Sequence, residues 1–232
     1  MASKEMLERM QRFQERMSAK RSGFMSLGVG QHIIRVLPSW RGDDEDWYLY
    51  LPTHYRVGPT PEIDKTGTVV TCLQFFGEKC PVEQYARKLL NSVDEHGEPI
   101  EKDVAKGQAF LKNSQDKVIM NVLPNNDAHG TICSLSVKYK PTFIEMQQLM
   151  LTSGDFFDPD EGYQLCITGT PAERGTYRWV EYKVTAVGRG TDKIAKASWR
   201  EELPNLDMFA EKCHRSREEI IALLQGKKQE KV

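Results

Sequence analysis

The chain has 232 residues, of which 39% are hydrophobic and 28% charged, and this balance suits one globular domain with insertions or tails. No apolar run approaches the roughly 20 residues that span a bilayer, so we expect no membrane segment. The formal net charge of −1 gives no overall attraction for nucleic acid, so a polyanion would need a local basic surface. Five cysteines without paired spacing and a charged N-terminus unlike a secretory signal favour the cytoplasm.

The first predicted element is an amphipathic helix over residues 4–18, where apolar side chains recur at helical spacing. This helix would pack on the body of the protein or on a neighbouring molecule. Three strands are predicted next, at 31–39, 47–57 and 68–76, because these runs are rich in β-branched and aromatic residues.

The middle of the chain is predicted to combine one helix with two strands. Helical spacing covers residues 82–93, and the polar stretch 94–107 is expected to be an excursion or mobile connection. Strands are expected at 117–125 and 131–140, joined by a hairpin turn at 125–130.

The last part of the chain is predicted to hold a helix, a second hairpin and a final helix. Proline opens and glycine closes residues 141–154, which is the asymmetry expected of a helix. The hairpin would pair strands at 163–170 and 177–187. The final helix, at 216–228, begins with a Ser-x-x-Glu capping box.

This order of elements predicts a mainly β fold with peripheral helices, of the α+β class. Short strands with turn residues at close intervals favour a small barrel or sandwich. A parallel α/β sheet would need a regular alternation of strands and helices, which the sequence lacks.

A compact set of Cys and His residues suggests a metal site. His54, Cys72 and Cys80 fall in one short window, and Glu83 stands where a Cys-Pro-Val-x run would place a second cysteine. Zinc prefers four such ligands in a tetrahedron, and a carboxylate can serve as one of them. The alternative is that the two cysteines are buried thiols that pack as small hydrophobic side chains.

A zinc enzyme is not supported by the same residues. Zinc deaminases place a glutamate two residues after the ligating histidine, but here that position is Arg56. The residues in the glycine-rich stretches lack the spacing of phosphate-binding motifs. We therefore expect no catalytic residues and no enzymatic activity.

Aromatic residues beside cations are the other signal in the sequence. The stretches HYR, QYARK, VKYK and YRWVEYK each combine rings with Lys or Arg. Single-stranded nucleic acid binding uses this mixture, because rings stack on bases while cations contact phosphates. The alternative is that about half of these rings point into the core, since the side chains of a strand alternate between its faces.

Two stretches of the sequence are similar to those of a known family. GQHIIRVLPS (30–39) and CPVEQYARK (80–88) resemble the single-stranded DNA-binding proteins of T-even-type phages. Looser similarities follow in the same order along residues 28–195. The resemblance implies an OB-type barrel with an inserted zinc-bearing subdomain and a DNA cleft between the two. It also implies cooperative, sequence-independent coating of single strands in phage replication, recombination and repair, inside an infected bacterial cell.

Carried over by residue, the resemblance places His54, Cys72 and Cys80 on the ligands of one structural zinc ion, with Glu83 replacing the fourth. It places Tyr85 on a ring that lines the DNA cleft. Together with the ring-and-cation pattern, this gives the following candidate DNA-binding residues: Tyr48, Tyr50, Tyr55, Arg56, Tyr85, Arg87, Lys88, Lys112, Lys117, Lys138, Tyr139 and Lys140.

Three segments are expected. Residues 1–27 would form a helical arm for self-association along DNA, and residues 28–200 the DNA-binding core, including the Cys/His subdomain at about 54–92. Residues 201–232 would be a helical segment, which lacks the family's acidic tail for recruiting replication proteins. The rival interpretation is an adaptor that uses the barrel to hold a replication or recombination protein.

Overall fold

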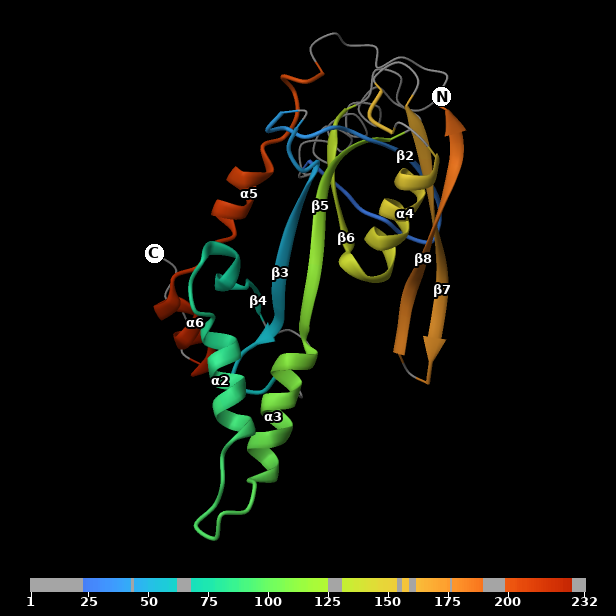
Figure 1. The fold of residues 1–232 in the computed structure, drawn as a ribbon. Helices are drawn as coiled ribbons and strands as arrows, with labels where there is room; N and C mark the ends of the chain where they lie inside the picture. The colour runs from blue at the N-terminus through green and yellow to red at the C-terminus, as the bar shows by residue number, and fades with distance from the viewer. Residues whose placement is uncertain are drawn as a thin grey trace, which may run out of the picture. The chain divides into compact units, whose positions relative to one another are not determined.

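The structure is a computed structural model (Figure 1). It describes residues 23–42, 44–61, 68–124, 131–153, 156–158, 162–175, 177–189 and 199–226. The predicted helix at 4–18 and the predicted turn at 125–130 lie outside these residues. Strands make up most of the regular structure and several helices accompany them, so the α+β class is confirmed. Within the described residues, no helix is both long and apolar enough to cross a membrane.

The chain divides into two compact units, each assembled from several segments. The first unit consists of Met1–Pro38, Asn121–Ser136 and Ser153–Pro204, and the second of Ser39–Met120, Val137–Thr152 and Asn205–Val232.

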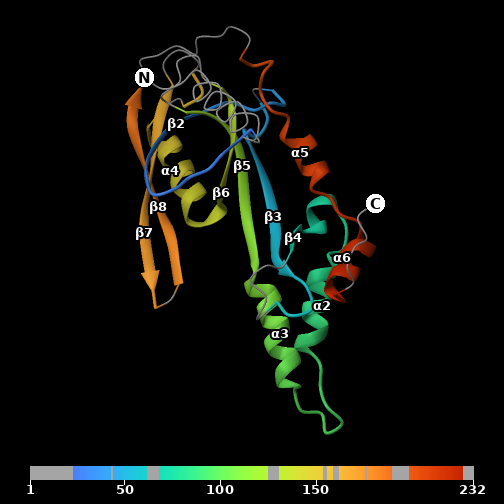
Figure 2. The ribbon, with the colours of Figure 1, turned by 180° about the vertical axis from the view of Figure 1, so that it is seen from behind.

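Strands of the first unit follow the order β1-β6-β5-β2-β7-β8. Their bounds are Phe24–Met25 (β1), Gly30–Val36 (β2), Ser114–Pro124 (β5, of which the end belongs here), Cys133–Lys138 (β6), Tyr163–Arg174 (β7) and Tyr177–Arg189 (β8). β2 lies between β5 and β7 and is antiparallel to both. The predicted second hairpin is confirmed as the long β7–β8 ribbon (Figure 2).

The sheet of the first unit is open. Its path begins at β1 and ends at β8, and no pairing among the described strands joins these two ends. The closed barrel expected from the sequence is therefore not what the described strands form. Closure needs a hydrogen-bonded partner for both edges, and a pattern of alternating side chains does not specify such a partner.

The second unit combines a three-stranded ladder with helices. β3 (Tyr48–Val57) pairs with β4 (Thr68–Thr71) on one side and with the first part of β5 on the other. The helical elements are η1 (Leu73–Phe76), α2 (Pro81–Leu90), α3 (Glu101–Lys112), η2 (Tyr139–Phe143), α4 (Ile144–Ser153), α5 (Leu206–Lys212) and α6 (Arg217–Leu224).

Helix α3 was not predicted, because residues 94–107 were expected to be an excursion or mobile connection. Its sequence is rich in charges, and Gly107 and Phe110 are the residues that it buries. Gly107 lets the two helices approach closely: a Cβ there would come within 2.8 Å of the Ala86 carbonyl oxygen on α2. The stability of α3 therefore comes from packing against α2 and not from an amphipathic pattern of its own.

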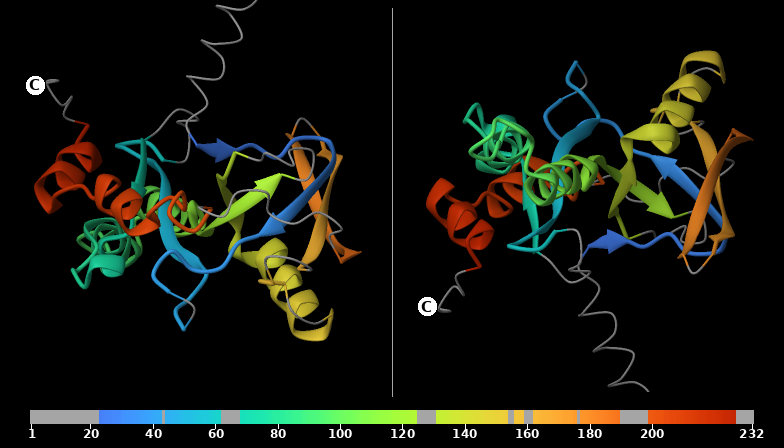
Figure 3. Two further views of the ribbon diagram at one scale, coloured as in Figure 1. Left: turned by 90° about the horizontal axis from the view of Figure 1, so that it is seen from above. Right: turned by 90° about the horizontal axis from the view of Figure 1, so that it is seen from below.

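Helix α2 lies beside both α3 and α6 in the second unit (Figure 3). Residues of all three helices belong to one hydrophobic cluster. Phe110 of α3 and Ile220 of α6 are buried in this cluster together with Cys72 and Cys80. The predicted capping box starts α6: Ser216 Oγ accepts from the Glu219 backbone N–H, and the Ser216 backbone N–H donates to Glu219 Oε2. The C-terminal helix is thus part of the core around the candidate metal ligands.

Candidate functional site

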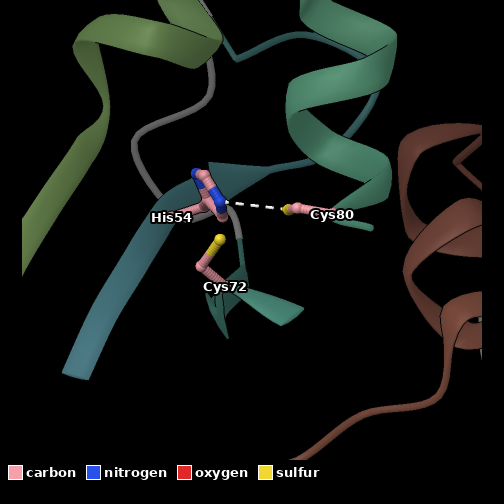
Figure 4. Close-up of side chains that lie close together, drawn as sticks. All are labelled: His54, Cys72 and Cys80. Carbon is pink, nitrogen blue, oxygen red and sulfur yellow. Dashed lines mark hydrogen bonds between the residues drawn. The ribbon is translucent and has the colours of Figure 1, made fainter. Parts of the chain in front are cut away.

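The three soft ligands predicted from the sequence come together in the second unit (Figure 4). His54 lies near the end of β3, Cys72 directly follows β4, and Cys80 precedes the first turn of α2. All three are buried, and their ligand atoms lie within 4.8 Å of one another. His54 Nε2 and Cys80 Sγ are 3.2 Å apart. This His/Cys/Cys cluster could hold a metal ion, and the donor set suits zinc.

Ser114 orients the imidazole ring of His54. Ser114 Oγ lies 2.7 Å from His54 Nδ1 and donates its only hydrogen to the Phe110 carbonyl oxygen at 3.3 Å. With a metal on Nε2, Nδ1 would carry the ring proton and donate it to this hydroxyl oxygen. This contact leaves Nε2, which faces Cys80, as the nitrogen available to a metal, the arrangement expected of a ligating histidine.

The two thiols of the cluster do not ionise independently. Hydrogen bonding from Cys72 lowers the pKa of Cys80, and contacts with His54 and the backbone N–H of Glu83 act in the same direction. The same hydrogen bond raises the pKa of Cys72, and burial adds to that effect. The two sulfurs therefore hold a proton unequally, and a metal bound by both would displace the protons that remain on them.

Glu83 lies beside the cluster and is not part of it. Its Oε1 is 3.7 Å from Cys72 Sγ, and its Oε2 accepts a hydrogen bond from Gln74 Nε2 at 2.6 Å. The group of ligand atoms within 4.8 Å of one another contains His54, Cys72 and Cys80 without this carboxylate. The proposed fourth ligand is thus held by a neighbouring amide.

A pocket of about 330 Å³ opens next to the cluster. Tyr50 and Phe75 contribute rings to it, and Asp116 and Glu83 contribute carboxylates. Its complete lining is Tyr50, Pro52, Thr53, His54, Cys72, Gln74, Phe75, Glu83, Ser114 and Asp116, with no Lys or Arg among these residues. A phosphate group would therefore find no cation in the pocket wall.

Besides lining this pocket, Tyr50 contacts Tyr139, a half-buried ring whose neighbours in the chain are two exposed lysines. Its ring is 38% exposed and meets the Tyr139 ring edge to face, with the centroids 5.5 Å apart. Burial of the ring and a hydrogen bond to Asp116 raise the pKa of Tyr50 to about 12, so its hydroxyl stays protonated at neutral pH. Lys138 and Lys140 flank Tyr139 in the chain, and both are exposed. We call Tyr50 and Tyr139, together with Lys138 and Lys140 as the neighbours of Tyr139 in the chain, the tyrosine face.

Tyr48 has a packing role beside the tyrosine face. It is half-buried, and its ring contacts Phe143 with the centroids 4.7 Å apart. Burial and the nearby Asp46 raise its pKa. It supports the turn that carries Tyr139, because Phe143 also contacts that ring.

The β3–β5 ladder separates the candidate DNA-binding residues onto two faces. Tyr50 is opposite Val118 and Leu51 is opposite Lys117, and directly opposed residues share a face while neighbours along a strand do not. Lys117 therefore lies on the face away from Tyr50. There its Nζ sits 5.1 Å from the centroid of the Tyr55 ring.

The remaining candidates lie on other elements of the second unit. Tyr85 is half-buried between α2 and α3, with Lys106 Nζ 5.5 Å from its ring centroid and Phe110 packed edge to face. Arg87 is exposed and lines a second pocket with Lys79, Cys80 and Glu83. Arg56 lies in the left-handed region at a bulge of β3, and Lys88 and Lys112 are exposed. None of these three lines either pocket.

Sequence reasoning missed three residues that shape the site. Ser114 orients His54, Gln74 holds Glu83, and Asp116 accepts a hydrogen bond from Tyr50. Ser114 and Asp116 belong to β5, whose sequence gives no sign that it pairs with β3. Gln74 stands two residues after Cys72, and this proximity was the one available signal.

A scan against protein-family models and a search of the curated proteins both return no match to this chain. The geometry of the second unit is therefore the main guide to function.

Proposed function

We propose that this protein binds single-stranded DNA without sequence preference and that the tyrosine face is its contact surface. The observation that supports this most strongly is the edge-to-face contact between Tyr50, which is 38% exposed, and the half-buried Tyr139, whose neighbours in the chain are two exposed lysines. Rings that stack on any base and cations that contact phosphates are the two components of such binding.

The charges around Tyr50 suggest how a strand would lie. Asp116 and Glu83 make the adjoining pocket acidic, so phosphates would stay outside it. Lys138 and Lys140 offer positive charge next to Tyr139. Bases would therefore stack on the two rings while the backbone follows the lysines.

A structural zinc ion would stabilise the strand that carries Tyr50. His54 and Tyr50 belong to the same strand and, being four residues apart, to the same face of it. Zinc held by His54, Cys72 and Cys80 would join β3, the end of β4 and the start of α2, and would thereby fix the strand that presents Tyr50. The ion would supply stability and no chemistry of its own.

The resemblance to the T-even-type phage proteins supports the biological part of the proposal. It suggests a role in phage DNA replication, recombination and repair in the infected bacterial cell, with cooperative coating of single strands. Any contact with phage replication proteins would have to use a surface other than the acidic tail that this chain lacks. An OB-type ancestry of the core also rests on that resemblance, since the described strands form an open sheet.

The direct test is titration of the protein with oligo-dT of increasing length at several salt concentrations. We expect the affinity to rise with oligonucleotide length. The logarithm of the binding constant should fall linearly with the logarithm of the salt concentration, because phosphate contacts release counterions. Mixed-sequence oligonucleotides should bind similarly, with differences limited to stacking strength. An affinity for oligo-dT that does not change with salt concentration would contradict the proposed phosphate contacts. If the protein binds no oligonucleotide but keeps a protein partner after nuclease treatment, the adaptor function is supported instead.

A further inference from the structure

The structure provides three metal ligands where a closed structural zinc site has four. Glu83 lies beside the cluster, and both of its oxygens already have neighbours. Oε2 is 2.6 Å from Gln74 Nε2, and Oε1 is 3.7 Å from Cys72 Sγ. The carboxylate would have to move to reach a metal between His54, Cys72 and Cys80, because the group of ligand atoms within 4.8 Å of one another does not include its oxygens.

The side of the cluster next to Glu83 is open to a pocket. His54, Cys72 and Glu83 all line the hollow of about 330 Å³ that also reaches Tyr50 and Phe75. A pocket of this size admits a small molecule beside the ligands. A site with three protein ligands and one open position takes an exchangeable donor, unlike a site closed by four protein ligands.

We propose that a metal ion bound here keeps a fourth coordination position that opens to this pocket and takes a small thiol, with Glu83 beside the metal and not bound to it. The chemistry of the walls selects the ligand. Asp116 and Glu83 disfavour anionic oxygen ligands, whereas the rings of Tyr50 and Phe75 suit a small apolar molecule. A thiol enters uncharged, its sulfur binds the metal, and its proton is released to solvent. This inference does not rest on DNA binding, so either can fail alone.

The test uses the full chain loaded with cobalt(II), whose visible spectrum reports the number of sulfur ligands and the geometry, and 2-mercaptoethanol as the probe. We expect a saturable rise in sulfur-to-cobalt charge-transfer absorption and a shift of the d–d bands. In Glu83→Cys a fourth protein ligand closes the site, so this variant should show the added absorption without thiol and no further change with it. Glu98→Cys, which adds a thiol at an exposed turn, should behave like wild type.

Gln74→Ala provides a second comparison, because it frees the Glu83 carboxylate to approach the metal. We expect this variant to respond to the thiol only at higher concentration than wild type. A wild-type spectrum that is unchanged by 2-mercaptoethanol would overturn the inference, as it would mean that the site is closed. The inference would also be overturned if wild-type protein binds no cobalt while Glu83→Cys does. It would be overturned as well if the first addition of 2-mercaptoethanol removes cobalt from the wild-type protein.

Discussion

Tyr50 and Tyr139 meet edge to face with their ring centroids 5.5 Å apart. The first belongs to the middle of β3 and the second to the turn after β6, so the pair depends on the fold of the second unit. Edge-to-face ring pairs contribute about 0.5–1.5 kcal/mol beyond the area that they bury. The contact therefore holds each ring in place while leaving Tyr50 partly exposed for a base.

Lys138 and Lys140 are predicted to carry phosphate contacts. Replacing both by alanine should make the slope of log K against log salt shallower by about 1.4, since each phosphate contact on a single strand contributes about 0.7. The measurement is an oligo-dT titration at four or more salt concentrations. Lys117→Ala is the control, because Lys117 lies on the other face of the ladder and its loss should leave the slope unchanged. Equal slopes for the double variant and wild type would remove these lysines from the contact surface.

Zinc is predicted to stabilise the fold through the His/Cys/Cys cluster. Zinc at about 100 times its dissociation constant would add about 2.7 kcal/mol, which for a chain of this size raises the melting temperature by about 5–10 °C. Thermal unfolding of chelator-treated protein with and without zinc measures this shift. Cys80→Ser should lose it, whereas Cys133→Ser, outside the cluster, should keep it. A shift that survives in Cys80→Ser would show that zinc binds elsewhere.

Asp207 is predicted to make stability depend on pH. Its carboxylate accepts hydrogen bonds from Arg41 and from Trp40 Nε1, and the Arg41 contact lowers the pKa of Asp207. A lowered pKa contributes stability above the unfolded-state value near 3.8, and this contribution is lost as pH falls through the lower folded-state value. Because both side chains are more than a third exposed, Asp207→Asn should cost only about 1 kcal/mol at pH 7.

Urea unfolding of wild type and Asp207→Asn at pH 7 and pH 3 measures this dependence. The difference in free energy of unfolding between wild type and Asp207→Asn should be smaller at pH 3 than at pH 7. Asp44→Asn, in an exposed loop, should have the stability of wild type at both pH values. A difference that is the same at pH 7 and pH 3 would mean that the ion pair with Arg41 is not its cause.

Ile220 is predicted to connect the C-terminal helix to the metal-bearing core. It is fully buried in the cluster that contains Cys72 and Cys80, so Ile220→Ala should lower the free energy of unfolding by about 2–5 kcal/mol. Chemical denaturation measures the loss. Met208→Ala on α5 is the control, since that side chain is 52% exposed and should change stability by less than about 0.5 kcal/mol. If Ile220→Ala and Met208→Ala have the same free energy of unfolding, α6 contributes little to this core.

Local patterns predicted much of the secondary structure. The capping box of α6 and the strand patterns at β2 and β3 depend on residues close in sequence, and all three elements form where expected. Helix α3 was missed because its stability depends on Gly107 meeting α2, a contact that its own charged sequence does not indicate. The open sheet differs from the expected barrel because strand alternation specifies faces and not edge partners.

Within the metal site, only the three ligands were predictable from the sequence. A histidine and two cysteines that lie close together in the sequence are typical of a metal site, so His54, Cys72 and Cys80 were identified from residue type and spacing. The supporting residue Ser114 and the opposite placement of Tyr50 and Lys117 follow from the register of β3 against β5. Register is a property of two distant segments and cannot be derived from either one alone.

The most direct test of the proposed function is the affinity for oligo-dT of the double variant Tyr50→Ala, Tyr139→Ala. Each stacking ring contributes about 1–3 kcal/mol, so the loss per ring should be roughly 5- to 150-fold. Tyr55→Ala, on the opposite face, should bind within a few-fold of wild type, with melting temperatures measured for all variants. A folded double variant that binds oligo-dT as tightly as wild type would contradict the claim that the tyrosine face is the DNA contact surface.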